Sequence, residues 1–154
     1  MPPENKRYRP ERHRDYFVEF SSALFHTDTV TIPNSKGSYA LIFSLKGETQ
    51  QVIGKLGLSC FRSGIYGYAG NAYGGGGLRA RLQRHFASGG RTHWHIDYLK
   101  SLATLHGAWV FDEGCECDVA NAMLSVPGAC LSVDGFGASD CKRCRSHLVL
   151  LEER

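Results

Sequence analysis

The amino-acid sequence predicts an α/β or α+β fold, with a small mixed, largely antiparallel β-sheet of three to five strands flanked by helices. Apolar runs of strand length, such as SYALIFSL (38–45) and TLHGAWVF (104–111), alternate with segments whose apolar residues recur at helical spacing, such as LRARLQRHF (78–86). The chain has 154 residues, of which 42% are hydrophobic, and this is enough for one compact core.

Three strands are predicted in the first half of the chain. The segment 38–45 is apolar on both faces, which is typical of a central strand covered on both sides. QQVIGKLG (50–57) is predicted to be its hairpin partner. GIYGYAG (64–70) is predicted to be a third strand, in which Tyr66 and Tyr68 share one face because side chains alternate along a strand.

A helix is predicted directly after this third strand. Leu78, Leu82 and Phe86 recur every four residues and form its buried stripe. Arg81 and His85 lie one turn apart along one edge of that stripe, from which they can reach across the face of the sheet.

The remaining elements are predicted from shorter patterns. THWHIDYLKSL (92–102) is predicted to be a second helix, and 104–111 a strand. Residues 115–124 are predicted to form a short helix whose first turn directs Glu116 inward, and 146–153 a final strand or helix.

The N-terminal residues differ in composition from the rest. Residues 1–32 are predicted to be a basic, partly disordered extension, and residues 33–154 to form the domain. No apolar run approaches the roughly 18 residues that span a bilayer. The first residues lack the apolar core of a secretory signal, so a cytoplasmic location is expected.

Charge is unevenly distributed, although the net charge is only +3. Two segments are basic and contain Arg79, Arg81, Arg84, Arg91, Lys142, Arg143 and Arg145. A compact acidic segment contains Asp112, Glu113, Glu116 and Asp118. This distribution fits a polyanionic partner, with a cation held at the acids. A solvated surface of mixed charge is the alternative reading.

Six cysteines raise the question of a metal site. Cys141 and Cys144 are spaced as CxxC and are followed by His147, and Cys115 or Cys117 could complete a tetrahedral zinc site. Free thiols are the alternative, since the pattern contains a single CxxC.

The glycine-rich loop before residue 78 does not match a nucleotide-binding motif. A P-loop requires Lys and Ser or Thr after its last glycine, where this chain has Leu78 and Arg79. The dinucleotide pattern GxGxxG begins at Gly74 and Gly76 but ends on Arg79. A helix that begins behind a glycine loop and carries arginines still favours an anionic phosphate.

Five segments together resemble the GIY-YIG endonuclease superfamily, and more narrowly its Uri-type branch, also described as DUF123. They are GSYALIFSL, GKLG, GYAGNAYGGGGLRARLQRH, HWHIDYL and GFGASDCKRCRSHL. The resemblance spans about residues 37–150. In it, the GIY element falls on residues 37–39 and the YIG element on 68–70, whereas the letters GIY at 64–66 are a coincidence.

The resemblance implies an active site that cleaves nucleic-acid phosphodiesters with one divalent cation, Mg²⁺ or Mn²⁺. Tyr39 is implied to deprotonate or orient the attacking water, and Tyr68 to hydrogen-bond near it. Arg81 is implied to neutralise the phosphate, His85 to assist phosphate contact or proton transfer, and Glu116 to hold the metal. Neighbouring positive charge is expected to lower the pKa of the two tyrosines.

Further residues are candidates for contact with nucleic acid: Gly70, Arg79, Arg84, His93, His95, Lys142 and Arg143. Tyr66 and Tyr73 are candidates to stack on an unpaired base or to line the loop. The family often has an asparagine near its C-terminal part, for which Ser139 or Asp140 is a weak substitute. Each of these side chains also has a purely structural reading, as core aromatic, helix-surface cation or helix-terminal acid.

The function predicted from the sequence is therefore a metal-dependent endonuclease acting on DNA, with single-stranded DNA and repair or recombination intermediates as candidate substrates. A non-catalytic nucleic-acid-binding module of the same fold is the first alternative. A zinc-bearing interaction domain built around the cysteines is the second. No membrane partner is expected.

Overall fold

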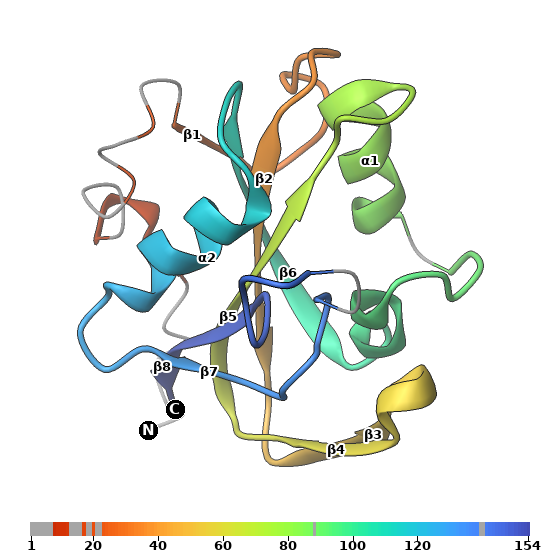
Figure 1. The fold of residues 1–154 in the computed structure, drawn as a ribbon, viewed down its shortest axis with the longest axis vertical. Helices are drawn as coiled ribbons and strands as arrows, with labels where there is room; N and C mark the ends of the chain where they lie inside the picture. Colours follow the sequence, from red (N-terminus) through yellow and green to blue (C-terminus); the bar gives the residue numbers. More distant parts are fainter. Residues whose placement is uncertain (1–7, 13–16, 18–19, 21–22, 88, 139–140) are drawn as a thin grey trace, which may run out of the picture.

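The computed structural model describes residues 8–12, 17, 20, 23–87, 89–138 and 141–154 (Figure 1). The strands are β1 (Leu24–His26), β2 (Ser38–Leu45), β3 (Thr49–Val52), β4 (Leu58–Phe61), β5 (Gly64–Asn71), β6 (Ala103–Phe111), β7 (Cys130–Leu131) and β8 (Leu148–Glu153). The helices are the α-helices α1 (Gly77–Phe86) and α2 (Glu116–Leu124) and the 3-10 helices η1 (Pro10–Arg12), η3 (Gly54–Leu56) and η4 (His95–Leu99).

The described strands form a six-stranded sheet in the order β1-β6-β2-β5-β8-β7 and a separate two-stranded sheet, β3-β4. All strand pairs are antiparallel, so the predicted α+β class is confirmed. The main sheet has more strands than predicted because its edge strands, β1 and β7, have only three and two residues. Strands this short show no readable alternation of polar and apolar residues.

Helices cover both faces of the main sheet (Figure 1). The predicted central strand is confirmed: β2 lies between β5 and β6 and is buried on both faces. One apolar layer packs β2 and β5 against α1 and η4 through Tyr39, Leu41, Phe43, Tyr66, Tyr68, Leu78, Leu82 and Ile96. The other packs the same strands against α2 through Ala40, Ile42, Ile65, Ala69, Val119, Ala120 and Met123. Alternation of side chains along β2 and β5 therefore fills two cores at once.

Two predicted elements are wrong. Residues 50–57 are not the hairpin partner of β2, because β5 and β6 already occupy both of its edges and β3 pairs with β4 instead. The helix predicted over 92–102 is a 3-10 helix limited to η4. The Asp97 carboxylate accepts the backbone N–H groups of His93 and Trp94, each at 2.8 Å, which holds Trp94 extended and delays the start of the helix.

Aromatic residues from the predicted N-terminal extension pack beside α2. Phe17 lies with its ring centroid 5.2 Å from that of Trp109, and Phe20 lies 4.4 Å from Phe111. The Trp109 indole N–H donates to the Tyr8 hydroxyl at 2.7 Å. Residues 1–7, 13–16, 18–19 and 21–22 of the predicted extension lie outside the described residues, whereas its residues 24–26 form β1, which pairs with β6.

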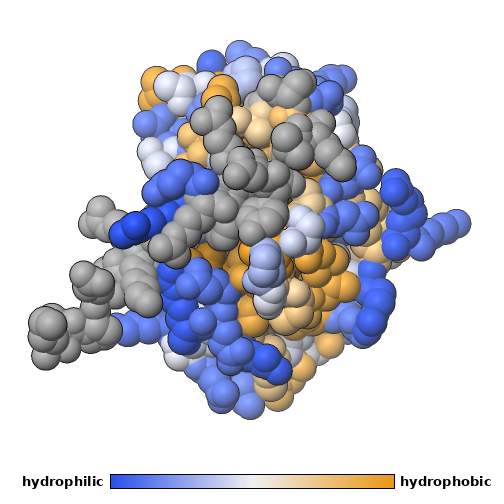
Figure 2. Space-filling model, turned by 90° about the vertical axis from the view of Figure 1, so that its left-hand side faces the viewer, coloured by the Kyte–Doolittle hydropathy of each residue, from blue (hydrophilic) through white to orange (hydrophobic). Residues whose placement is uncertain are grey.

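The surface on the α2 side carries an apolar area bordered by hydrophilic residues (Figure 2). Among the described residues, none of the helices has the length and apolar character needed to cross a membrane.

Candidate active site

A cavity of about 710 Å³ opens where the start of β2 and the end of β5 meet α1, η4 and the first turn of α2. Nine of the residues predicted from the sequence line it: Tyr39, Tyr68, Gly70, Arg81, His93, His95, Glu116, Lys142 and Arg143. These residues are far apart in the chain, so the fold gathers them into one site.

Antiparallel pairing of β2 with β5 sets the positions of the two tyrosines. Tyr39 lies opposite Gly70, and Tyr68 lies opposite Leu41, so both tyrosines point to the α1 face. A Cβ atom at residue 70 would collide with the Tyr39 ring. Gly70 is therefore required sterically, because its missing side chain lets the Tyr39 ring lie across β5.

Tyr66, which carries the coincidental GIY letters, is not part of the cavity wall. Its side chain is fully buried, its ring stacks on Phe43 with centroids 5.5 Å apart, and its hydroxyl donates to the Arg62 carbonyl at 2.6 Å. The prediction that Tyr66 could stack on an unpaired base is therefore wrong. Tyr73 is exposed, and its hydroxyl donates to the Gly114 carbonyl at 2.5 Å.

Tyr39 and His85 form a buried hydrogen-bonded pair beneath the cavity. The Tyr39 hydroxyl lies 2.7 Å from His85 Nε2, and both side chains are almost completely buried. Burial lowers the pKa of His85 to about 3, although the carboxylate of Asp97 acts in the opposite direction. His85 is thus a neutral hydrogen-bonding partner of Tyr39 at neutral pH. Within the described residues, His85 Nδ1 has no hydrogen-bond partner.

Both site tyrosines are uncharged at neutral pH. Burial raises the pKa of Tyr39, and the nearby Tyr68 raises it further, while Arg81 acts to lower it. Burial also raises the pKa of Tyr68, and Arg81 again opposes this effect. In the protein without a bound cation, desolvation therefore outweighs the positive charge that the sequence predicted to lower these pKa values.

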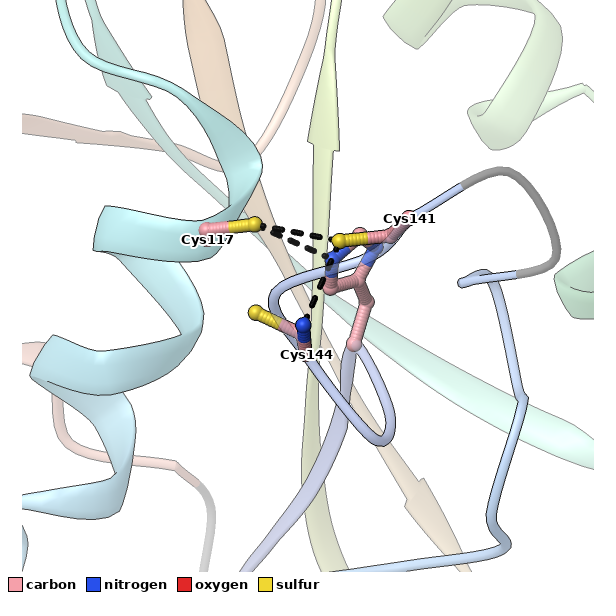
Figure 3. Close-up of side chains that lie close together, drawn as sticks. Cys117, Cys141 and Cys144 are labelled. Carbon is pink, nitrogen blue, oxygen red and sulfur yellow. Dashed lines mark hydrogen bonds between the residues drawn. The ribbon is translucent and has the colours of Figure 1, made fainter.

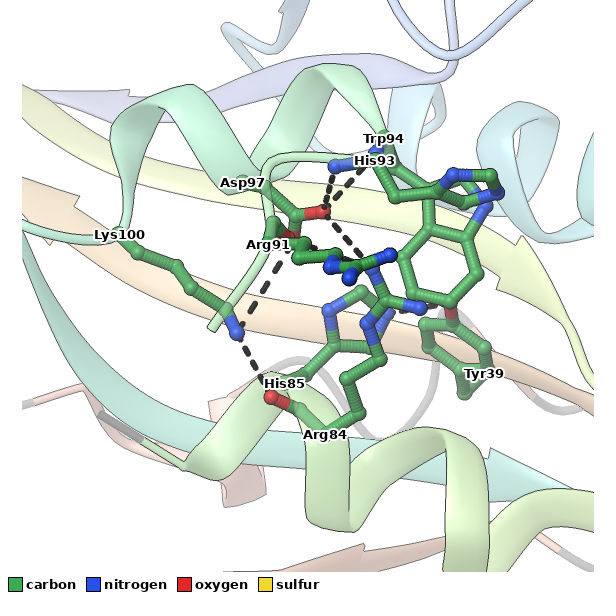
Figure 4. A network of polar contacts seen from close by, with 8 residues as sticks. All are labelled: Tyr39, Arg84, His85, Arg91, His93, Trp94, Asp97 and Lys100. Carbon is green, nitrogen blue, oxygen red and sulfur yellow. Dashed lines mark hydrogen bonds and ion pairs between the residues drawn. The ribbon is translucent and has the colours of Figure 1, made fainter. Parts of the chain in front are cut away.

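Arg81 reaches the cavity from the edge of α1, as the helical spacing predicted. Its guanidinium carbon lies 4.4 Å from the ring centroid of Trp94, and Arg84 lies 4.0 Å from the same ring. Figure 4 shows how Asp97 organises this group: its buried carboxylate is 3.5 Å from Arg84 and 3.9 Å from Lys100. This network fixes the wall against which Arg81 rests.

Glu116 is the first residue of α2, and its half-buried carboxylate lines the cavity. The side-chain amide of Asn71 donates to this carboxylate. Asp112 and Glu113 do not line the cavity. Among the described residues that line the cavity, Glu116 is the one carboxylate.

Three predicted residues do not line the cavity. His85 lies behind Tyr39, as described above. Arg79 donates from Nε to the Ile32 carbonyl at 2.6 Å, and Arg84 is held by Trp94 and Asp97. Ser139 and Asp140, the weak substitutes for an asparagine, lie outside the described residues.

The sequence reasoning missed the parts played by Asn71, Trp94 and Asp97. Asn71 immediately follows the YIG-like element on β5, but its side chain lies on the α2 face, where alternation places it. For Trp94 and Asp97, the sequence did contain a signal. Asp97 stands three residues after Trp94 at the start of η4, and an acid at this position can accept the preceding backbone N–H groups.

Side chains of the zinc-ligand type gather between α2 and the loop before β8 (Figure 3). The ligand atoms of Cys117, Cys141, Cys144 and His147 all lie within 4.8 Å of one another. Of the two cysteines that the sequence left open, Cys117 therefore joins the CxxC and the histidine. Cys115 instead accepts a contact from Arg143 at 3.9 Å.

The buried His85 should make stability depend on pH. Its pKa is about 3 in the folded protein and ordinary, near 6.5, when unfolded. The unfolded state therefore binds more protons between these values, and the stability contribution present above about pH 6.5 is lost as the pH falls. As the pH falls below about 6.5, we expect the free energy of unfolding of the wild type to decrease relative to that of His85→Gln by up to about 1.4 kcal/mol per pH unit.

Urea unfolding of both proteins between about pH 7 and about pH 4 measures this difference. A difference in unfolding free energy that stays constant over this range would show that His85 titrates normally. Glutamine is the appropriate replacement, because it is uncharged throughout and can still accept a hydrogen bond from Tyr39.

The fold and the cavity define an antiparallel α+β domain with a polar, tyrosine-lined site between a helix start and a glycine-bearing strand. The family described as "Domain of unknown function DUF123" matches residues 38–154, and the chain belongs to this family. The resemblance to DUF123 is thus confirmed. A search of curated proteins and a search of solved structures gave no match.

Proposed function

We propose that this protein is a metal-dependent endonuclease of the GIY-YIG type that hydrolyses phosphodiester bonds in DNA. One observation carries the proposal: Tyr39, Tyr68, Arg81 and Glu116 come from four elements and line one cavity. They are the residues at which the resemblance to GIY-YIG nucleases implies catalysis. The DUF123 description gives no activity, so the proposal rests on this geometry and that resemblance.

Arg81 binds the scissile phosphate in this mechanism. A phosphodiester is anionic and repels a nucleophile, so its charge must be neutralised before water attacks. The guanidinium can place two N–H donors on two phosphate oxygens, and its contact with Trp94 limits the orientations it can adopt. Lys142 and Arg143 line the cavity and add positive charge along the path of the strand.

Glu116 would hold the divalent cation. A bound Mg²⁺ or Mn²⁺ would neutralise charge on the phosphate and make a water molecule more acidic. Asn71 donates to the same carboxylate and fixes its orientation, leaving the remaining lone pairs of Glu116 for the cation.

Tyr39 orients the attacking water rather than acting as a tyrosinate. Its pKa is raised by burial, so it carries its proton at neutral pH. The Tyr39 hydroxyl is hydrogen-bonded to Nε2 of the neutral His85, and this bond leaves at least one lone pair of the hydroxyl oxygen to accept a hydrogen bond from water. Tyr68 lies on the same face of the sheet as Tyr39 and lines the same cavity, so its ring limits where that water can lie.

Tyr39→Phe tests this role, because it keeps the ring and removes only the hydroxyl. We expect the cleavage rate to fall about 10- to 100-fold, at the low end for general acid–base contributions. The pH–rate profile should keep its shape, since the ionisation that it reports is that of the water and not of Tyr39. Single-turnover rates across pH measure both quantities. A near-wild-type rate would exclude Tyr39 from the reaction, and loss of one limb of the profile would make Tyr39 the base.

The cavity surroundings favour an extended strand as substrate. His93, Lys142 and Arg143 are exposed around the cavity, and the glycine at residue 70 lets the Tyr39 ring lie across β5 at its wall. These features suit a backbone that passes across the end of the sheet. Single-stranded DNA and branched intermediates of repair or recombination are therefore the substrates to test first.

The deciding experiment incubates the full chain with labelled single-stranded, duplex and flapped DNA and with RNA, in Mg²⁺, Mn²⁺ or EDTA. We expect cleavage of at least one DNA substrate that requires the added cation and is abolished by EDTA. Tight binding without cleavage under all conditions would instead support a non-catalytic nucleic-acid-binding module. If the protein neither binds nor cleaves any of these substrates, nucleic acid is excluded as its partner.

A further inference from the structure

We propose that Cys117, Cys141, Cys144 and His147 bind one structural zinc ion, which joins the first turn of α2 to the loop that precedes β8. The four ligand atoms lie within 4.8 Å of one another, and Cys117 and His147 are buried. Figure 3 shows Cys117 pointing from α2 toward Cys141, with Cys144 beside them. Three cysteines and one histidine form a common ligand set for structural zinc.

The separations fit tetrahedral coordination. With zinc–sulfur bonds of about 2.3 Å, two thiolates on one tetrahedral ion lie about 3.8 Å apart. Cys117 Sγ lies 3.4 Å from Cys141 Sγ and 3.7 Å from His147 Nε2. Small movements therefore suffice to place all four ligand atoms around one ion.

The surrounding hydrogen bonds are those of a prepared metal site. His147 Nδ1 donates to the Gly137 carbonyl at 2.9 Å, which leaves Nε2 without a proton and directed at the cysteines. Metal-bound histidines generally donate their other ring N–H in this way. Within the CxxC, the Cys144 backbone N–H donates to Cys141 Sγ at 3.3 Å, and such a bond stabilises a thiolate ligand.

The ion would be structural rather than catalytic, because four protein ligands leave no position open for substrate. Its place in the fold gives it a consequence for the cavity. Cys117 follows Glu116 directly, and Lys142 and Arg143 lie between the two cysteines of the CxxC. Zinc at this point would hold the carboxylate and the two cations at fixed positions. The effect on cleavage rests on the proposed function, whereas zinc binding does not.

Metal analysis of the full chain, expressed with zinc and purified without chelator, tests the proposal directly. We expect about one zinc ion per chain. Protein stripped of metal should recover zinc when titrated against a chromophoric chelator. A zinc content below about a tenth of an ion per chain, with no uptake in the titration, would overturn the proposal. If the protein as purified contains no zinc and instead has a disulfide between two of the three cysteines, the proposal is overturned equally.

Cobalt substitution identifies the ligands. Co²⁺ bound at this site should give the strong near-ultraviolet absorption of thiolate ligation and the intense visible bands of tetrahedral geometry. Cys144→Ser should weaken or abolish these bands, and Cys115→Ser should leave them unchanged. Cys115 is the matched control because it lies two residues before Cys117 but outside the cluster. Equal loss in both variants, or the weak bands of octahedral Co²⁺, would contradict the assignment.

Because a ligand variant can also fail to fold, the wild type supplies an independent measurement. Removing zinc from the wild type should lower its Tm by roughly 10 °C, and adding zinc back should restore it. Stoichiometric zinc in a protein that cuts no nucleic acid would refute the proposed function and leave the zinc site standing. If a zinc-free protein cleaves DNA at the full rate and its Tm is unchanged, the zinc site is refuted and the proposed function stands.

Discussion

Glu116→Gln is expected to reduce the proposed metal-dependent DNA cleavage by about 10³-fold or more, because glutamine keeps the shape of the side chain but removes the negative charge that would hold the cation. The fold should persist, since Glu116 is half-buried at the start of α2 and its carboxylate is replaced by an isosteric amide. Raising the Mg²⁺ or Mn²⁺ concentration should recover part of the rate. Single-turnover cleavage rates across a range of metal concentrations measure both effects.

Glu113→Gln is the matched control. Glu113 is an exposed acid three residues earlier that does not line the cavity, and its backbone carbonyl, which accepts a hydrogen bond from Ser38, is unchanged by the substitution. We expect its rate to stay within about twofold of the wild type, as for surface substitutions away from a site. Equal rates for Glu116→Gln and the wild type would show that the cation is held elsewhere or that the reaction needs none.

Part of this architecture follows from local sequence. The apolar segment 38–45 reads as a doubly covered strand because every position in it is apolar or small, and it is the central strand β2. The four-residue recurrence of Leu78, Leu82 and Phe86 places α1 and sets Arg81 and His85 on its inner edge. Both signals depend only on near neighbours in the chain.

Other parts depend on tertiary contacts that no local pattern carries. The partner of β2 is β5 rather than 50–57, because pairing depends on which edges other strands occupy. Cys117 joins the cysteine cluster rather than Cys115, because the first turn of α2 directs Cys117 toward Cys141, whereas Cys115 contacts Arg143. The interaction of Asn71 with Glu116 likewise joins a strand end to a helix start 45 residues later.

Burial and charge act in opposite directions at the proposed catalytic tyrosines. Counting positive residues near Tyr39 predicts a lowered pKa, but the side chain is almost completely buried and its pKa is raised. Removing a phenol from water disfavours the charged form more than one half-buried arginine favours it. Sequence shows which charges are near, whereas the sign of a pKa shift depends on how much water the fold excludes.

Arg81→Ala is expected to lower the cleavage rate about 10²- to 10³-fold, comparable to the loss of one donor that stabilises transition-state charge. Arg81→Lys should recover little of this loss. A lysine carries the charge, but it cannot place two parallel donors on a phosphate or lie flat on Trp94 as the guanidinium does. Single-turnover rates at saturating DNA separate this effect from weaker binding.

Arg91→Ala is the control, because it removes the same charge from the same basic segment at an exposed position. Arg91 contributes its backbone carbonyl to Arg84, and this contact survives the substitution. We expect Arg91→Ala to weaken DNA binding slightly and to leave the saturated cleavage rate unchanged. If the two alanine variants lose equal rate, or if only binding falls in Arg81→Ala, then Arg81 attracts the strand and does not act on the scissile phosphate.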